Sequence, residues 1–410
     1  MDQETEQIAP SPGGVALESP SPCPETDADN APNAVSIPAT TPPKRRFLGR
    51  VRSTIGSGID WLFGAVTLLF GLAALSVIPI LNFASLGYLL RASANVAQSG
   101  RIRDGFIGVR KASRIGSFII GSWIAVLPLR FVAGLWHERQ IVAPGTDGGW
   151  RIGVTVLTVL TVFHLVWASL RGGRLRHFLW PAPIRFLKWL RRPDSYFSIR
   201  DAVLDYIASL RLPHYFWLGA RGFAGAFAWL CLPVGVMIAA SRLPPGGAAV
   251  LSLLASFPLM FAVMYLPFLQ TRFACEDRFQ ALFEVRAVRD LFQRAPVAFW
   301  FALFITLLFA IPLYLLKIEL TPRELAWLPA VLFVAFIFPA RVLTGWAVSR
   351  AFKREQPRLW LSRWAARFAV IPVVGIYALI TYFTQFLTWH GAPALLEHHA
   401  FMTPAPLLGL

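Results

Sequence analysis

The chain has 410 residues, of which 56% are hydrophobic, 14% aromatic and only 15% charged. A soluble domain carries about a quarter charged residues, so this composition excludes an ordinary soluble enzyme or binding domain. Apolar stretches of about 20 residues, the length that crosses the hydrocarbon layer as a helix, recur along the chain. The sequence therefore predicts an all-α fold, a polytopic helical bundle in a membrane.

The basic residues are divided among many short segments. The net charge of +17 would suit a nucleic-acid-binding protein if these residues formed one patch. They lie instead between the apolar stretches, which is typical of membrane topology signals, so we predict no nucleic-acid partner. Residues 1–43 contain seven acidic residues and no lysine or arginine. Because this segment is rich in Pro and Ser, we predict a disordered cytoplasmic tail.

Residues 44–390 are predicted to form the membrane domain, which begins with an interrupted apolar stretch. Residues 59–90 are too long for one simple span, and Pro79 and Asn82 interrupt them. The next segment, 91–114, contains six basic residues. Two arms that return to the same side, as a re-entrant hairpin or as two short spans, explain this charge. A single tilted helix with a basic outer loop is the alternative.

Seven further spans are predicted at residues 117–136, 152–170, 215–240, 248–270, 296–316, 326–349 and 367–388. With a returning first stretch, the segments on one side of the membrane hold thirty Lys and Arg residues and those on the other side hold five. Basic loops stay in the cytoplasm. We therefore predict a bacterial inner-membrane protein with a cytoplasmic N-terminus and an extracytoplasmic C-terminus, residues 391–410 forming a short outer tail.

The predicted cytoplasmic loops are amphipathic. Residues 179–192 alternate aromatic and aliphatic residues with four basic ones, which are Arg185, Lys188, Arg191 and Arg192. This pattern favours a segment in the membrane interface, with its bases on anionic phospholipid headgroups. Residues 199–210 and 279–293 show a similar pattern. The alternatives are that the charges set topology only, or that these loops bind a partner protein.

Four ionisable residues lie within predicted spans, where such residues are costly and often functional. They are Arg130, Arg341, Arg221 and His164. Arg130 and Arg341 each follow a proline by two residues, so either could donate to the carbonyl that the proline leaves free, or could bind an anion. Arg221 is expected to reach the water at its span's inner end. His164, near Trp167, is expected to be a hydrogen-bonded structural histidine.

No motif of a known reaction is present. The phosphate-binding, dinucleotide-binding, zinc-protease and nucleophile-elbow patterns are all absent from the sequence. The three cysteines are too scattered for a metal site. We predict no catalytic residue, cofactor or metal. No Asp or Glu lies in the middle of a predicted span, which disfavours a proton-coupled carrier.

One stretch resembles a known family. Ile78-Pro79-Ile80-Leu81-Asn82, then Gly87-Tyr88 and Arg91, resembles the I-P-I-L-N…G-Y…R hallmark of an uncharacterised bacterial multi-pass membrane family, catalogued as a domain of unknown function. Residues 265–300 are similar to its later half. The family often has an acidic turn where this chain has residues 103–106. The resemblance implies the membrane architecture and no activity.

Three functional hypotheses follow from the sequence. The first is a non-enzymatic membrane protein that organises lipids or binds a partner through its basic loops. The second is a transporter or permease for a small solute, which would be an anion if Arg130 and Arg341 bind it. The third is a lipid-modifying enzyme, although no nucleophile or base can be named for it.

Overall fold

The computed structural model describes residues 47–142, 148–190, 195–318, 327–387, 395, 399 and 401–403. The chain divides into two units, 1–52 and 53–410. The first is described only where the first helix begins, and all packing below belongs to the second. Every regular element in the described ranges is helical, which confirms the predicted all-α fold. The predicted tail, 1–43, lies outside the described residues.

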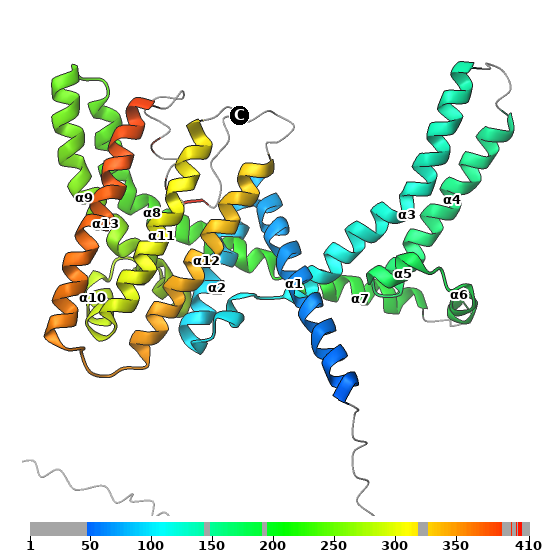
Figure 1. The fold of residues 1–410 in the computed structure, drawn as a ribbon, viewed down its shortest axis with the longest axis horizontal. Helices are drawn as coiled ribbons and strands as arrows, with labels where there is room; N and C mark the ends of the chain where they lie inside the picture. Colours follow the sequence, from blue (N-terminus) through cyan, green and yellow to red (C-terminus); the bar gives the residue numbers. More distant parts are fainter. Residues whose placement is uncertain are drawn as a thin grey trace, which may run out of the picture. The chain divides into compact units, whose positions relative to one another are not determined.

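The helices follow one another with short connections (Figure 1). In the first half they are α1 (Phe47–Val77), α2 (Asn82–Ser99), the 3-10 helix η1 (Ile102–Gly105), α3 (Val109–Val142), α4 (Gly148–Leu170), α5 (Leu175–Leu179), α6 (Pro183–Leu190) and α7 (Ser195–Ser209). In the second half they are α8 (Leu212–Ala240), α9 (Pro245–Glu276), η2 (Phe279–Leu282), α10 (Val285–Arg294), α11 (Pro296–Ile318), α12 (Trp327–Phe352) and α13 (Trp360–Leu387).

Seven of the described helices are long and apolar enough to cross a membrane, and the number is eight if the bent pair α10–α11 is counted as one span. The seven further spans predicted from the sequence fall on α3, α4, α8, α9, α11, α12 and α13. Membrane character is therefore confirmed. The side of the membrane on which each loop lies stays a prediction.

The first apolar stretch is broken where the sequence predicts it. α1 ends at Val77 and α2 begins at Asn82, and Ile80 in between has a positive φ of 72°, which a β-branched residue rarely adopts. The hydroxyl of Ser85 donates to the carbonyl of Leu72 at 3.2 Å, so α2 turns back onto the end of α1. The structure thus favours two arms over one tilted helix.

α2 lies at the centre of the bundle rather than against lipid. It packs on α8, α9 and α12, and most of its residues are buried. Gly87 and Gly219 bring the backbones of α2 and α8 together, and Gly345 brings α12 onto Ser93. Small residues allow this close approach in membrane helices. α2 is not among the helices apolar enough to span a membrane, because neighbouring helices, and not lipid, cover it.

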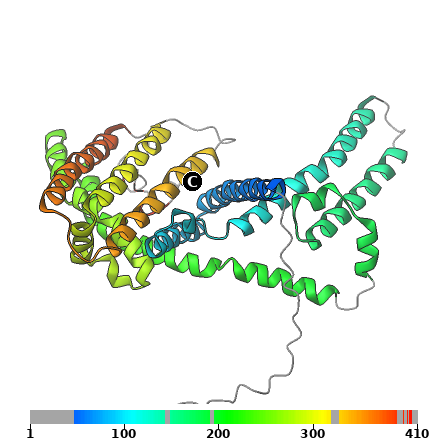
Figure 2. The ribbon, with the colours of Figure 1, turned by 60° about the horizontal axis from the view of Figure 1, so that its bottom comes forward.

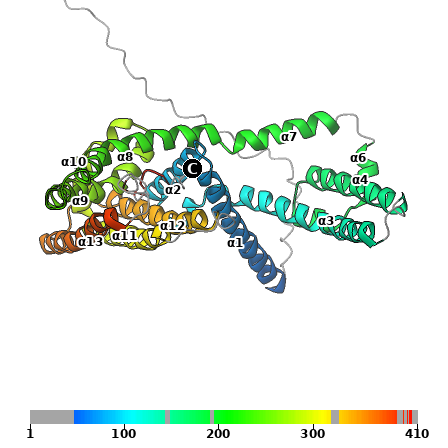
Figure 3. The same ribbon diagram turned by 90° about the horizontal axis from the view of Figure 1, so that it is seen from above.

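Two further groups of helices complete the second unit. α3 and α4 pack on each other, and α5 lies near the end of α4 and contacts α3 at Gly121 (Figure 2). α11 lies between α12 and α13, and α13 also packs on α9 (Figure 3). α10 is a short amphipathic helix, bent by 114° from α11, that buries Val288 and Leu291.

Four of the five described residues after α13 are buried, with Leu395 and His399 at most 1% exposed and Phe401 and Met402 at 6%. The physical reason is that their apolar side chains join the core around α8, α9 and α13. The side of the membrane on which residues 391–410 lie stays a prediction. We call residues 399–403 the closing segment; Ala400 within it lies outside the described residues.

Candidate functional site

Among the residues whose burial the structure describes, Arg341 is the most deeply buried charged residue within a span. It lies on α12 and is 4% exposed. Its Nη1 donates to Oε1 of Gln270 on α9 at 2.7 Å, and its guanidinium lies 5.9 Å from the ring of Phe401. Its Nη2 is buried and has no hydrogen-bond partner in the described part of the chain.

Gln270 connects Arg341 to the closing segment. Its side-chain nitrogen donates to the carbonyl of Phe401 at 2.8 Å and to that of Gly222 on α8 at 3.3 Å. Near Phe401, the hydroxyl of Tyr377 on α13 is 2.8 Å from Nδ1 of His399. One fully buried amide therefore joins α8, α9, α12 and the closing segment.

Three buried hydroxyls lie beside this network. Ser93 on α2 is 2.7 Å from the hydroxyl of Thr271 and 3.3 Å from that of Thr344. Thr344 also donates to the carbonyl of Arg341 at 2.8 Å. The site is thus a polar centre within the apolar core, where each hydrogen bond is favoured because water is excluded.

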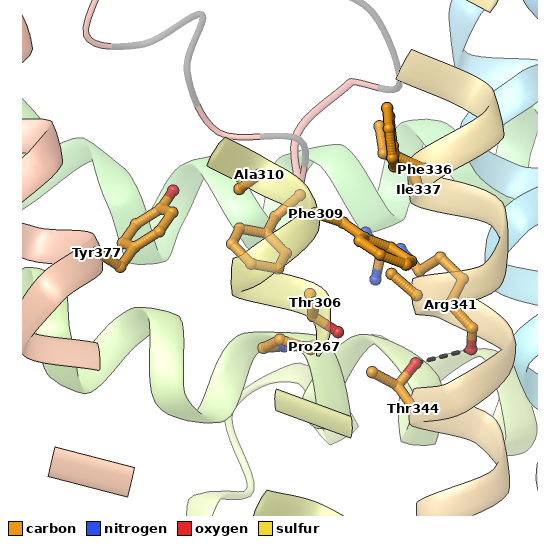
Figure 4. Close-up of a pocket in the computed structure, with 11 residues that line it drawn as sticks. Pro267, Thr306, Phe309, Ala310, Phe336, Ile337, Arg341, Thr344 and Tyr377 are labelled. Carbon is orange, nitrogen blue, oxygen red and sulfur yellow. Dashed lines mark hydrogen bonds between the residues drawn. The ribbon is translucent and has the colours of Figure 1, made fainter. Parts of the chain in front are cut away.

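A cavity of about 30 Å³ adjoins Arg341 (Figure 4). Its walls come from α9, α11, α12, α13 and the closing segment, and most of them are apolar. They include Phe309, Phe336, Phe401, Thr306 and Thr344. The volume exceeds the roughly 10–15 Å³ that one water molecule needs.

The structure does not bring Arg130 to this centre. Arg130 lies on α3, exposed, and α3 packs on α4 and α5. In the described residues, Arg341 donates to Gln270 and not to Ala335, the carbonyl that Pro339 leaves free. The carbonyl role predicted for Arg341 is therefore wrong, because the amide of Gln270 is the acceptor that its guanidinium meets. The two arginines do not form a paired anion site.

Arg221 and His164 have partners close to the ends of their helices. Arg221 forms an ion pair with Asp277 at the end of α9 and lies 5.4 Å from the ring of Phe273. Its side chain is 24% exposed, in keeping with the expected reach towards water. His164 Nε2 is 2.7 Å from the carbonyl of Phe178, which confirms a hydrogen-bonded structural histidine.

The end of α4 holds the beginning of the predicted interfacial segment. Trp167 donates to the carbonyl of Pro181 at 2.8 Å, and Arg171 donates to that of Trp180 at 2.6 Å. His177 on α5 is buried beside several arginines, and burial is the larger of the two causes that lower its pKa. The two hydrogen bonds of Trp167 and Arg171 hold the chain before α6 against the end of α4.

Residues 179–192 contain the predicted lipid-headgroup contacts. Arg185 is exposed on α6, and Leu179, Trp180 and Ile184 are more than 60% exposed, as an interfacial segment requires. The chain at Lys188 is part of α6, but its side chain lies outside the described residues, as do Arg191 and Arg192 entirely. The headgroup contacts stay a prediction.

A groove that the sequence reasoning missed lies between the end of α12 and the beginning of α11. We call it the arginine groove. It has a volume of about 360 Å³, and three arginines line it together with Trp300, Phe301 and Trp346. The arginines are Arg350, Arg354 and Arg358. Their spacing of four residues was visible in the sequence, but it was counted only as topology charge.

A second groove lies along α10. It measures about 560 Å³ and runs between α9, α10, α11 and α13. Its walls are mainly apolar, and Arg289 and Arg367 are among the lining residues. Arg367 lies 5.5 Å from the ring of Trp364. Both grooves therefore combine apolar walls with arginines beside the same amphipathic helix.

Comparison with known proteins gives no further information. No family model, no curated protein and no solved structure matches the chain. The family resemblance of residues 78–91 therefore stays a prediction, and the functional argument depends on the geometry alone.

Proposed function

We propose that this integral membrane protein is a non-enzymatic binder of anionic phospholipid, and that the arginine groove holds the headgroup. The observation that carries the proposal is the convergence of Arg350, Arg354 and Arg358 on one groove. Within the described ranges none of the three forms an ion pair. Guanidinium groups bind phosphate in a bidentate manner, so three unpaired ones provide strong attraction for a phosphodiester.

The neighbouring apolar residues suit the rest of a lipid. Val297 and Phe301 on α11 are 58% and 40% exposed, and both line the groove. Leu308, 41% exposed, continues this face two turns further along α11. An acyl chain can therefore follow α11 into the hydrocarbon while the phosphate stays at the arginines. Basic pockets between membrane helices bind anionic headgroups in this way.

The rigidity of the groove supports the same conclusion. Arg350 lies 5.2 Å from the ring of Trp346, a cation–π contact that holds its guanidinium in place. The backbone N–H of Arg358 donates to the carbonyl of Gln293 at 2.9 Å. Nη1 of Arg354 donates to the carbonyl of Arg294 at 3.4 Å. The guanidinium groups of Arg350 and Arg354 are therefore held before a lipid arrives, which reduces the entropy cost of binding. Glu355 is exposed in the same connection and is the nearest acid in sequence that could compete.

The test compares a triple variant with a matched control. Arg350, Arg354 and Arg358 are replaced by Gln in one protein, and the exposed Arg101, Arg110 and Arg114 in another. Phosphatidylglycerol that co-purifies is measured by mass spectrometry, and the unfolding temperature is measured with added phosphatidylglycerol or phosphatidylcholine. We expect phosphatidylglycerol alone to stabilise the wild type and the control, because the control loses the same charge outside the groove. Equal losses in both triple variants, or equal stabilisation by both lipids, would contradict the proposal.

A further inference from the structure

Arg341 is a buried cation for which the described chain supplies no counter-charge. It is 4% exposed, and no carboxylate in the described ranges lies within ion-pair distance. Its Nη1 donates a hydrogen bond to Gln270, whereas Nη2 is buried and has no hydrogen-bond partner in the described ranges. Burying an unpaired guanidinium is strongly unfavourable. A bound anion that supplies the missing counter-charge explains why this arginine lies in the core.

The adjoining cavity suits an anion better than a water molecule. The hydroxyls of Thr306 and Thr344, which line it, donate to the carbonyls of Ala302 and Arg341. A buried water needs two to four polar partners, and the guanidinium is the main donor left on this wall. An anion gains from the full positive charge. Three phenylalanines also line the cavity and separate this charge from water.

We propose that this cavity binds a small monovalent anion of halide size against Nη2 of Arg341. The volume of about 30 Å³ leaves no room for a larger organic anion. The closing segment covers the site, because Phe401 lines the cavity and its carbonyl accepts a hydrogen bond from Gln270. The same amide accepts a hydrogen bond from Arg341. Gln270 therefore connects the closing segment directly to the arginine that would hold the anion.

The first experiment measures anion-dependent stability of the full chain in detergent. Unfolding temperature is followed while chloride or bromide replaces gluconate at constant ionic strength. We expect a saturable rise with either halide and none with gluconate. R341M is expected to weaken the apparent halide affinity about tenfold to a hundredfold, since one charge-assisted hydrogen bond is lost. R110M, which removes an exposed arginine on α3 outside both the cavity and the arginine groove, is expected to keep the wild-type response. An identical response in R341M and the wild type would overturn the proposal.

A second measurement needs only the wild-type protein and therefore holds even if R341M does not fold. Crystals grown in bromide are examined for anomalous scattering. A peak beside Nη2 of Arg341 supports the proposal. An ordered water at that position, or bromide at exposed arginines only, overturns it. The result is independent of phospholipid binding, because the arginine groove and this cavity share no lining residue.

Discussion

Replacing Gly87 by alanine places a methyl group inside the contact between α2 and α8. A Cβ at this position would lie 2.7 Å from the carbonyl carbon of Tyr215 and 2.8 Å from the backbone nitrogen of Gly219, and closer still to the Tyr215 oxygen. Real Cβ atoms essentially never come within 3.0 Å of such atoms. All three neighbours are backbone atoms, so no side chain can rotate away, and the two helices have to separate.

The separation spreads beyond the substituted residue. α2 and α8 bury Leu86, Leu90 and Leu218 in one cluster, each at most 1% exposed, and these contacts loosen together when the helices part. Overpacking a core costs about 1–3 kcal/mol, and we expect the upper end, about 3 kcal/mol, because the clash is with backbone.

The matched control is Gly235→Ala on α8, where an added Cβ would have no atom within 4 Å. Alanine favours helix over glycine by about 1 kcal/mol, so this variant is expected to be unchanged or slightly more stable. Equilibrium unfolding in mixtures of SDS and a mild detergent measures both free energies. If the two variants unfold within about 0.5 kcal/mol of each other, the close packing of α2 on α8 is refuted.

Three other predictions concern the connections between spans. Trp167→Phe removes the hydrogen-bond donor to the carbonyl of Pro181 and should lower the local stability of the connection between α4 and α6 by about 1 kcal/mol. We expect faster hydrogen exchange at residues 174–182 and unchanged exchange in α9. The pKa of His177 is lowered by burial and by nearby arginines, so the folded state binds its proton less readily than the unfolded state. Stability of α5 should therefore fall as the pH drops below about 6.5, and H177Q should remove this dependence. Local stability is measured by hydrogen exchange in α5, and a protection factor that does not vary with pH would contradict the lowered pKa of His177. Arg272→Gln breaks ion pairs at 2.7 Å with Glu276 and 2.6 Å with Glu284. We expect a loss of about 1.5 kcal/mol or more in an unfolding titration, partly restored by Arg272→Lys, and an unchanged midpoint would show that the pairs are solvent-screened.

The spans could be predicted from the sequence because each depends on one local property. A run of apolar residues long enough to cross the membrane is visible without any partner, and α3, α4, α8, α9, α11, α12 and α13 were found in this way. The break before α2 was visible for the same reason, since Pro79 and Asn82 interrupt the run. His164 could also be predicted, because a polar side chain in a span requires a hydrogen bond.

The sites could not be predicted in the same way, because they depend on residues far apart in the chain. Arg341 meets Gln270, 71 residues earlier, and Gln270 meets Phe401, 131 residues later. Neither periodicity nor hydropathy encodes such pairs. Arg130 and Arg341 share a local pattern, a proline two residues before, but they belong to helices with different neighbours, which the sequence does not reveal.

The central position of α2 has a consequence for how the protein is made. Ser93 on α2 pairs with Thr271 and Thr344, which are synthesised 178 and 251 residues later. Until α9 and α12 have been inserted, α2 can pack on α1, η1 and α8 only, and the hydroxyl of Ser93 lacks both of these partners. α2 is therefore synthesised long before the residues that complete its packing. A chain that stops before α12 lacks one of the helices that bury α2, and incompletely folded chains of this kind are targets of cellular proteases.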